Sequence, residues 1–310
     1  MGSIVTWYNG FLNDTELIHR IVIWVGTVFP IYVFVVTSKF TFKVIGKEIY
    51  EKKWLILKVV LVAAILTPLI AAGIVKVFTI PLVLGGIMLI AAIAVGDPFD
   101  LVDAHGKKGS LLMASAIMIV LVLLMPLTVP IWMGIFSQWF PLHLAASPEG
   151  VFTKVAVVAL VPMLAGLLFR QFLPKVTDVL EKILHWYFKV SAILLVIIFI
   201  AGSIGKIINV FSVNGIIAMI IMTSITIISG YYAAKGAERK DRISISLACS
   251  LGNMAAVFFI AYHAYPELEK NSDFLITVFG WVVLRWIIIW IWYFIMKYRV
   301  EKKGEVLVKD

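Results

Sequence analysis

Residues 246–259 read SLACSLGNMAAVFF, and they decide the fold because they interrupt a long apolar run with small polar groups. Those small polar residues are Ser246, Ser250, Gly252 and Asn253. The hydrocarbon interior of a membrane offers such groups no hydrogen-bond partner, so polar residues at that depth face protein or water. The stretch therefore predicts a broken helix whose polar groups face a second element or a cavity.

The composition places the whole chain in a membrane. Of its 310 residues, 62% are hydrophobic and the mean hydropathy is +1.03, which no water-soluble domain of this size shows. Apolar runs of about 20 residues, the length that crosses roughly 30 Å of hydrocarbon, recur along the chain. We therefore expect one polytopic, all-α transmembrane domain over residues 1–310. Its nine predicted segments are 19–38, 54–77, 80–104, 109–137, 151–169, 184–207, 211–233, 241–265 and 273–297.

Basic residues gather in alternate connections between these segments. The stretches that carry 19 of the 27 Lys and Arg residues are 39–53, 105–108, 170–182, 235–242 and 297–310. Cytoplasmic loops are enriched in Lys and Arg, so these stretches are predicted to be cytoplasmic, with 170–182 a loop or a short surface helix. Nine spans then place the N-terminus outside and the C-terminus in the cytoplasm. The start of the chain lacks the basic residues of a cleaved signal peptide, so we expect none.

The sequence argues against several classes of protein. The net charge of +9 is spread over short loops rather than one patch, so no nucleic-acid partner is expected. The single cysteine, Cys249, excludes an internal disulfide. No HExxH, GxSxG or Walker-type glycine loop is present, so we expect neither an enzyme nor an ATP-driven pump. A channel or an exporter of the same fold stays open, although no filter-like repeat is visible.

A second break interrupts the third predicted segment at Gly96-Asp97-Pro98. Proline lacks an N–H group, and the residue before it avoids the helical region. A pair of broken hydrophobic segments, one in each half of a chain, is the best sequence pointer to the site of a secondary transporter. Close helix packing at small residues such as Gly252 is the alternative explanation.

Five further stretches carry a family resemblance through their order along the chain. They are KKWLILKVVLVAAILTPLIAAGIV (52–75), HGKKG (105–109), MPLTVPI (125–131), VPMLAGLLFRQFLPKVTDVLEKIL (161–184) and ISISLACSLGNMAAVFFIAYHAYPE (243–267). In this order they resemble the bile acid:sodium symporter superfamily, and the chain looks like a divergent, prokaryotic-type member. The resemblance covers residues from about 20 to 298.

The resemblance implies an architecture and a function. It implies inverted repeats at about 19–138 and 151–298, a core domain that holds both crossing helices, and a panel domain that moves against it. It also implies the nine-span form with an external N-terminus. We therefore expect a secondary active transporter, a symporter of a small organic anion in the cytoplasmic membrane. It is expected to need no cofactor, to use sodium as its coupling ion and to act as a monomer or weak homo-oligomer.

The chain departs from the family at the positions that usually bind sodium. Asn253 matches the family's asparagine, but Gly252 and Ala248 stand where the family has glutamine and glutamate. The glutamine of the earlier span falls at Ala63, and Asp97-Pro98 replaces the usual Ser-Asn of the first crossing. Sodium coupling therefore does not carry over directly, and a proton-coupled or uncoupled carrier or channel is the alternative.

Two intramembrane charges complete the candidate site. Asp97 is costly at that depth unless it is paired or hydrated, so it could bind sodium or a coupling proton or pair with Arg285, although it could also cap a helix that begins at Pro98. Arg285 stays charged, so it needs an anion, a structural partner or a route to the interface by snorkelling. Most of the tryptophans near 281–292 are expected to face lipid or the interface. The full candidate set for substrate and ion binding is Asp97, Pro98, Ser110, Ser115, Ser250, Gly252, Asn253 and Arg285, with Asp97, Ser115 and Asn253 as the sodium ligands.

Overall fold

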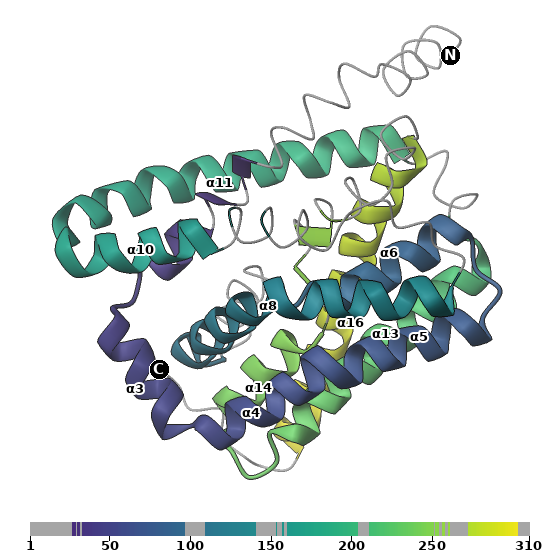
Figure 1. Ribbon diagram of the computed structural model, residues 1–310, viewed down its shortest axis with the longest axis horizontal. Helices are drawn as coiled ribbons and strands as arrows, with labels where there is room; N and C mark the ends of the chain where they lie inside the picture. The colour runs from purple at the N-terminus through teal and green to yellow at the C-terminus, as the bar shows by residue number, and fades with distance from the viewer. Residues whose placement is uncertain are drawn as a thin grey trace, which may run out of the picture.

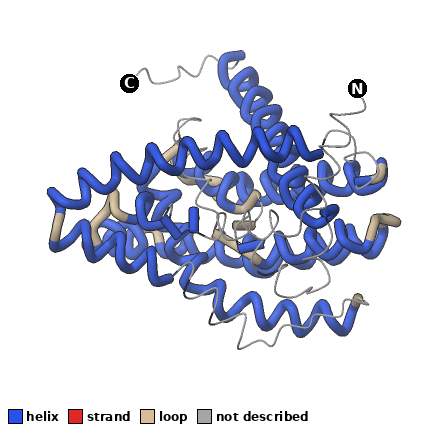
Figure 2. Tube along the Cα trace, turned by 90° about the horizontal axis from the view of Figure 1, so that it is seen from above, coloured by secondary structure: helices blue, strands red, loops and turns tan. Residues whose placement is uncertain are grey.

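Helices joined by short connections make up the part of the chain that the computed structural model describes. The described residues are 27–28, 30–31, 33–96, 109–140, 153, 157, 160–203, 211–250, 252–253, 256–257, 260 and 272–302, and within them no strand occurs (Figure 2). The elements are α3 (Phe42–Glu51), α4 (Lys53–Leu61), the π-helix η1 (Val62–Leu66), α5 (Thr67–Val77), α6 (Leu82–Ile93), α8 (Leu111–Trp139), α10 (Val161–Phe172), α11 (Pro174–Ser203), α13 (Val213–Ala233), α14 (Arg239–Ala248) and α16 (Ser272–Lys302).

Three of the described helices are long and apolar enough to cross a membrane: Lys53–Val77, Leu111–Trp139 and Val213–Ala233. The first of these is α4, η1 and α5 in direct succession. Shorter apolar helices lie at Leu82–Ile93, Val161–Phe172 and Val283–Ile295. The structure thus confirms an all-helical protein of the membrane type within the described ranges, and the number of nine spans stays a prediction.

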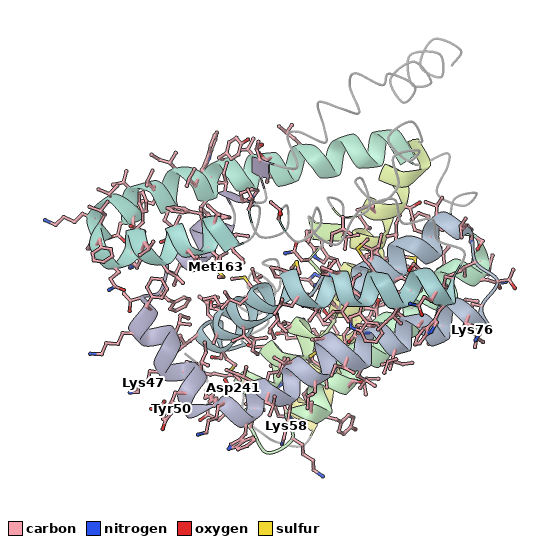
Figure 3. The ribbon with its side chains drawn as sticks, viewed as in Figure 1. Lys47, Tyr50, Lys58, Lys76, Met163 and Asp241 are labelled. Atoms are coloured by element: carbon pink, nitrogen blue, oxygen red, sulfur yellow. The ribbon has the colours of Figure 1, made fainter. Side chains whose placement is uncertain are left out.

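The exposed surface of these helices is apolar, as lipid contact requires. Large hydrophobic side chains are exposed along α8 and α13, among them Leu127, Ile131, Ile217 and Ile228. Soluble proteins seldom expose contiguous apolar surface of this kind. Charged side chains lie toward the two ends of the molecule (Figure 3). Lys47, Lys58 and Asp241, with Tyr50, lie toward one end, and Lys76 lies toward the other.

The helices form one large group with a pair beside it (Figure 1). The large group contains α4 to α6, α8, α13, α14 and α16, and α13 packs against α14, α16 and α5 within it. The pair is α10 and α11, which lie side by side along one edge and reach the rest through α3 and α16. Two clusters of buried hydrophobic residues hold these helices together, and the larger one extends to Met163 and Leu167 of α10. The ends of α6 and α14 lie in these clusters.

Two of the polar connections are helical: 170–182, for which the sequence left a loop or a short surface helix open, and 39–53. The stretch 170–182 is divided between α10 and α11 with only Leu173 between them, because Pro174 is well suited to a first helical position and Thr177 donates from Oγ1 to the Leu173 carbonyl at 2.8 Å. The charges there form an ion pair between Arg170 and Asp178. Likewise, 39–53 contains α3, whose N-cap is Thr41.

Candidate functional site

The ends of α6 and α14 meet through their backbones. α6 ends at Ile93 and α14 at Ala248, which agrees with the two breaks expected from the sequence. Beyond α14, the Gly252 N–H donates to the Ala91 carbonyl at 3.1 Å, and the Asn253 N–H donates to the Ala94 carbonyl. The last carbonyls of a helix lack partners inside that helix, so the 252–253 backbone satisfies groups that the end of α6 leaves open.

Gly252 is required at this contact for space. A Cβ atom at position 252 would lie 1.9 Å from the Ala91 oxygen and 2.6 Å from the Ala94 oxygen. Gly96, on the other segment of the crossing, has a φ of +83°, which residues with a Cβ rarely adopt. The two glycines therefore have different purposes, close backbone approach at Gly252 and conformation at Gly96. The short distances at Gly252 agree with close packing, the alternative explanation for this glycine. Close packing there is compatible with a binding role nearby.

Asn253 joins the two broken segments through its side chain. Its Nδ2 donates to the Gly96 carbonyl at 3.2 Å, and its Oδ1 accepts from the Ala256 N–H at 3.0 Å. The Val257 N–H donates to the Asn253 carbonyl at 2.8 Å, so Asn253 is the N-cap of the helical turn that follows it. The side chain is completely buried. An amide has two N–H groups and two lone-pair sites on its oxygen, so one donor and one acceptor are left for a ligand.

The candidate serines use their hydroxyl groups within the protein. Ser115 donates to the Leu111 carbonyl at 2.8 Å and Ser250 to the Leu247 carbonyl at 2.6 Å, and both are buried. Their oxygens can still accept a hydrogen bond or contact a cation. Ser110 is elsewhere. It caps α8, its N–H donates to the Lys240 carbonyl in the first turn of α14 at 3.2 Å, and its carbonyl accepts from Ser244 Oγ in the middle of that helix at 2.9 Å. The structure therefore does not bring Ser110 to the crossing.

Arg285 and Trp281 are buried on one face of α16, at 1% and 0% exposure. Snorkelling of Arg285 to the interface, one of the alternatives raised by the sequence, is thus wrong, because the helix turns this residue toward the protein. Most tryptophans of this helix were expected to face lipid or the interface; Trp281 is an exception for the same reason, whereas Trp290 is 44% exposed. Asp97 and Pro98, the remaining candidates, lie outside the described residues.

An apolar cluster occupies two of the positions at which the sequence resemblance implied polar sodium ligands. Ala63 and Ala248 belong to one buried cluster together with Val95, Met113 and Cys249. No group of three or more His, Cys, Asp or Glu side chains suited to a metal ion occurs among the described residues. Ala63 and Ala248 thus supply no side-chain oxygen at these two positions.

An ion-pair network at the start of α14 was missed by the sequence analysis. Lys52 Nζ lies 2.7 Å from Glu48 Oε1 and 2.8 Å from Asp241 Oδ2, and both carboxylates are buried. Burial alone would lower the pKa of Lys52, but its hydrogen bonds to Asp241 and Glu48 outweigh burial and raise that pKa above 10.5. The network fastens the junction of α3 and α4 to α14, whose first turn contains Asp241. Nothing in the local sequence could have indicated a pairing over 189 residues.

A second missed feature is the π-helix η1. Pro68 follows it and lacks the N–H that would bond the Ala64 carbonyl four residues earlier. Trp132 of α8 donates to that carbonyl from Nε1 at 2.8 Å. Thr67 donates to the Val62 carbonyl at 3.0 Å and closes the wide turn. π-Helical turns are frequent at functional sites, and Ala63 of the apolar cluster lies in this one.

Comparison with known families identifies the fold's relatives. The sequence model of the Sodium Bile acid symporter family matches residues 27–232, which is more than half of the chain. The chain belongs to this family. Members of the sodium bile acid symporter family are membrane transporters rather than enzymes, in agreement with the all-helical apolar structure. The family match includes the end of α6 and stops before α14. No curated protein matches the chain.

Proposed function

We propose that this member of the sodium bile acid symporter family is a secondary carrier of a small organic anion, and that its binding site lies where the chain after α6 crosses the chain after α14. The observation that carries the proposal is the joining of these two ends through Gly252 and Asn253. Interrupted helices expose backbone carbonyl and N–H groups inside a protein, and such groups can hold cations and anionic substrates. Close packing alone would not need the capping amide of Asn253 between them.

Coupling is proposed to depend on Asp97 rather than on the usual sodium ligands. The apolar cluster that contains Ala63 and Ala248 leaves no described side-chain oxygen at the positions of the family's glutamine and glutamate. Asp97 follows Gly96 directly, and the Gly96 carbonyl is bonded to Asn253. We propose that Asp97, with Ser115 and Asn253, binds a sodium ion, or that Asp97 itself carries a coupling proton. An uncoupled carrier or channel of the same fold is the alternative.

The remaining architecture is proposed from the charge pattern and the family. It consists of nine spans in the cytoplasmic membrane, inverted repeats at about 19–138 and 151–298, and core and panel domains. The separate position of α10 and α11 supports a panel distinct from the larger group. In a Cys249→Ala background, cysteines introduced at 2–12 should react with an impermeant thiol reagent added outside, and a cysteine at 305 should not. The reverse labelling would contradict this orientation.

A ligand screen tests the proposed function. Purified protein is heated with cholate, benzoate or hexanoate in sodium or potassium salts at several pH values, and unfolding is followed. A ligand that binds only the folded state stabilises it, by about 2.7 kcal/mol at a concentration one hundred times Kd. The proposal predicts stabilisation by at least one of these anions. Absence of any anion-dependent stabilisation, together with absence of anion flux in liposomes, would refute it.

A further inference from the structure

We propose that Trp281 and Arg285 of α16 form the anion-binding end of the substrate site, which takes the carboxylate of an organic anion with an apolar body. This inference rests on the proposed function and assigns a ligand chemistry to it. The two residues are one helical turn apart, so their side chains leave α16 on the same face. They are also among the largest fully buried side chains of the described chain.

The indole N–H of Trp281 carries the argument. Trp281 Nε1 is buried and has no hydrogen-bond acceptor among the described residues. A buried donor without a partner costs about 1–3 kcal/mol, so buried tryptophan N–H groups usually find one. An indole can only donate a hydrogen bond. The partner that this site lacks is therefore an acceptor, and a carboxylate oxygen of a ligand supplies it.

Arg285 supplies the positive charge next to that donor. Its guanidinium is permanently charged and is 1% exposed. A guanidinium carries five N–H groups in a planar fork, so it can hold a carboxylate in addition to its contacts with the protein. A buried cation and a buried N–H donor one turn apart favour a ligand with a single negative charge over a cation or a neutral molecule.

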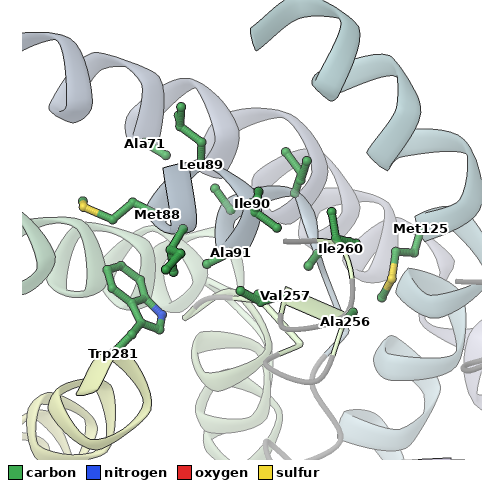
Figure 4. Close-up of a cluster of buried hydrophobic side chains, with 14 of the residues drawn as sticks. Ala71, Met88, Leu89, Ile90, Ala91, Met125, Ala256, Val257, Ile260 and Trp281 are labelled. Carbon is green, nitrogen blue, oxygen red and sulfur yellow. The ribbon is translucent and has the colours of Figure 1, made fainter. Parts of the chain in front are cut away.

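The neighbours of Trp281 determine the rest of the ligand. Figure 4 shows the indole extending from α16 toward Met88 and Ala91 of α6, with Val257 and Ile260 beyond them. All of these are apolar side chains of one buried cluster, so a ligand body that contacts them is expected to be apolar. The Ala91 carbonyl accepts a hydrogen bond from the Gly252 N–H at the crossing, so this end of the site adjoins the crossing.

The burial of both residues also indicates how the ligand enters. Trp281 is packed between α16 and α6, which contact each other. Both side chains are covered in the described conformation, so a carboxylate reaches Nε1 only after neighbouring elements move, and the anion stabilises the conformation that exposes the Trp281 N–H.

Substitutions that remove only the donor or only the charge test the assignment. Trp281→Phe keeps an aromatic ring but removes the N–H, and Arg285→Gln removes the charge, with Arg285→Lys as a variant that keeps it. Trp290→Phe, on the exposed face of the same helix, is the matched control. Binding of benzoate, hexanoate and cholate is measured by calorimetry on the full-length protein, with inorganic phosphate as the arm that detects a site for small inorganic anions.

We expect Trp281→Phe to weaken carboxylate binding about tenfold or more and Trp290→Phe to leave it unchanged, since one hydrogen bond to a charged group is lost only in the first variant.

In protein labelled with 5-fluorotryptophan, the fluorine signal that disappears in Trp281→Phe should shift when benzoate is added. If the wild type binds a carboxylate but Trp281→Phe binds it equally well, or this signal does not respond, the assignment is wrong and the carrier function stands. Tighter binding of phosphate than of every carboxylate would also overturn it. If the wild type binds none of the anions, both proposals fail.

Discussion

The side-chain amide of Asn253 donates a hydrogen bond at 3.2 Å to the backbone carbonyl of Gly96, 157 residues earlier in the chain. Gly96 follows the end of α6 and Asn253 follows the end of α14, so each lies at one of the two interruptions. The same amide caps the helical turn that begins after Asn253, through the Ala256 N–H. A single side chain thus holds both interruptions in one arrangement, and it leaves one donor and one acceptor for a ligand.

Replacement of Asn253 by Ala removes both hydrogen bonds. We expect a loss of about 1–3 kcal/mol in the free energy of unfolding, from the lost cap and the unpaired Gly96 carbonyl. We also expect stabilisation by organic anions to disappear, since the crossing is the proposed site. Thermal unfolding with and without ligand measures both effects. A variant that is less stable but binds anions with unchanged affinity would show that Asn253 has only a structural role.

Gly252→Ala tests the close approach of the two backbones. The added Cβ would meet the Ala91 oxygen at 1.9 Å, so the crossing must open. We expect a destabilisation of about 1–3 kcal/mol and a loss of ligand response. Gly73→Ala in α5 is the matched control, because a Cβ there meets no atom within 4 Å and should raise stability by up to about 1 kcal/mol. Equal effects of the two substitutions on the melting temperature would contradict the described contact.

The network around Lys52 predicts a pH dependence of stability. Its pKa is raised above 10.5 in the folded protein, so its contribution is fully present below the unfolded pKa and is lost as pH rises through the folded pKa. The melting temperature should therefore fall more steeply above pH 10.5 in the wild type than in Lys52→Met.

At pH 7.5, Asp241→Asn should lower the free energy of unfolding by about 1–3 kcal/mol. Lys47→Gln, which breaks the exposed 3.8 Å pair with Glu51, should have little effect. The same loss in both variants would mean that burial of the network is unimportant.

The hydrogen bond from Trp132 to Ala64 predicts a coupling with Pro68. Trp132→Phe should destabilise the protein by about 1–3 kcal/mol, because the Ala64 carbonyl loses its donor. In a Pro68→Ala background the new N–H of residue 68 can bond that carbonyl, so the same change should cost less. A double-mutant cycle on the free energy of unfolding measures the difference. Strict additivity would indicate that Trp132 does not compensate for the proline.

Parts of this structure could be read from the sequence and parts could not. The interruption at Gly252 and Asn253 was predictable because polar groups inside an apolar run must face protein. For 170–182 the sequence left a loop and a surface helix open, since its charges are typical of both, and the structure shows helix. Burial of Arg285 was also not predictable, because a helix that is apolar nearly all round shows no stripe that marks its inner face. Contacts such as that of Lys52 with Asp241 depend on the tertiary fold alone.

The candidate site divides in the same way. Asn253 was proposed for its amide, and its hydrogen bonds place it at the contact between the two interruptions. Ser110 was proposed from its position in the chain, but its backbone bonds Lys240 in the first turn of α14 and Ser244 in the middle of that helix, and not the segment after its end. Most tryptophans of α16 were assigned to lipid or the interface because aromatic residues are frequent at membrane interfaces, and only the packing of α16 against α6 reveals the burial of Trp281.

The most direct test of the central claim is the cation dependence of anion binding in Asp97→Asn. This substitution keeps the shape and the capping ability of the side chain and removes only its charge and its titrating proton. Wild type and variant are heated with the carboxylate that stabilises the wild type most, at constant ionic strength in sodium or potassium and from pH 5.5 to 8.5. The account predicts that the variant folds normally, that its response no longer depends on sodium, and that it no longer depends on pH where the wild type does. A variant that keeps the ion dependence and the pH response of the wild type would contradict the account and leave Asp97 as a helix cap.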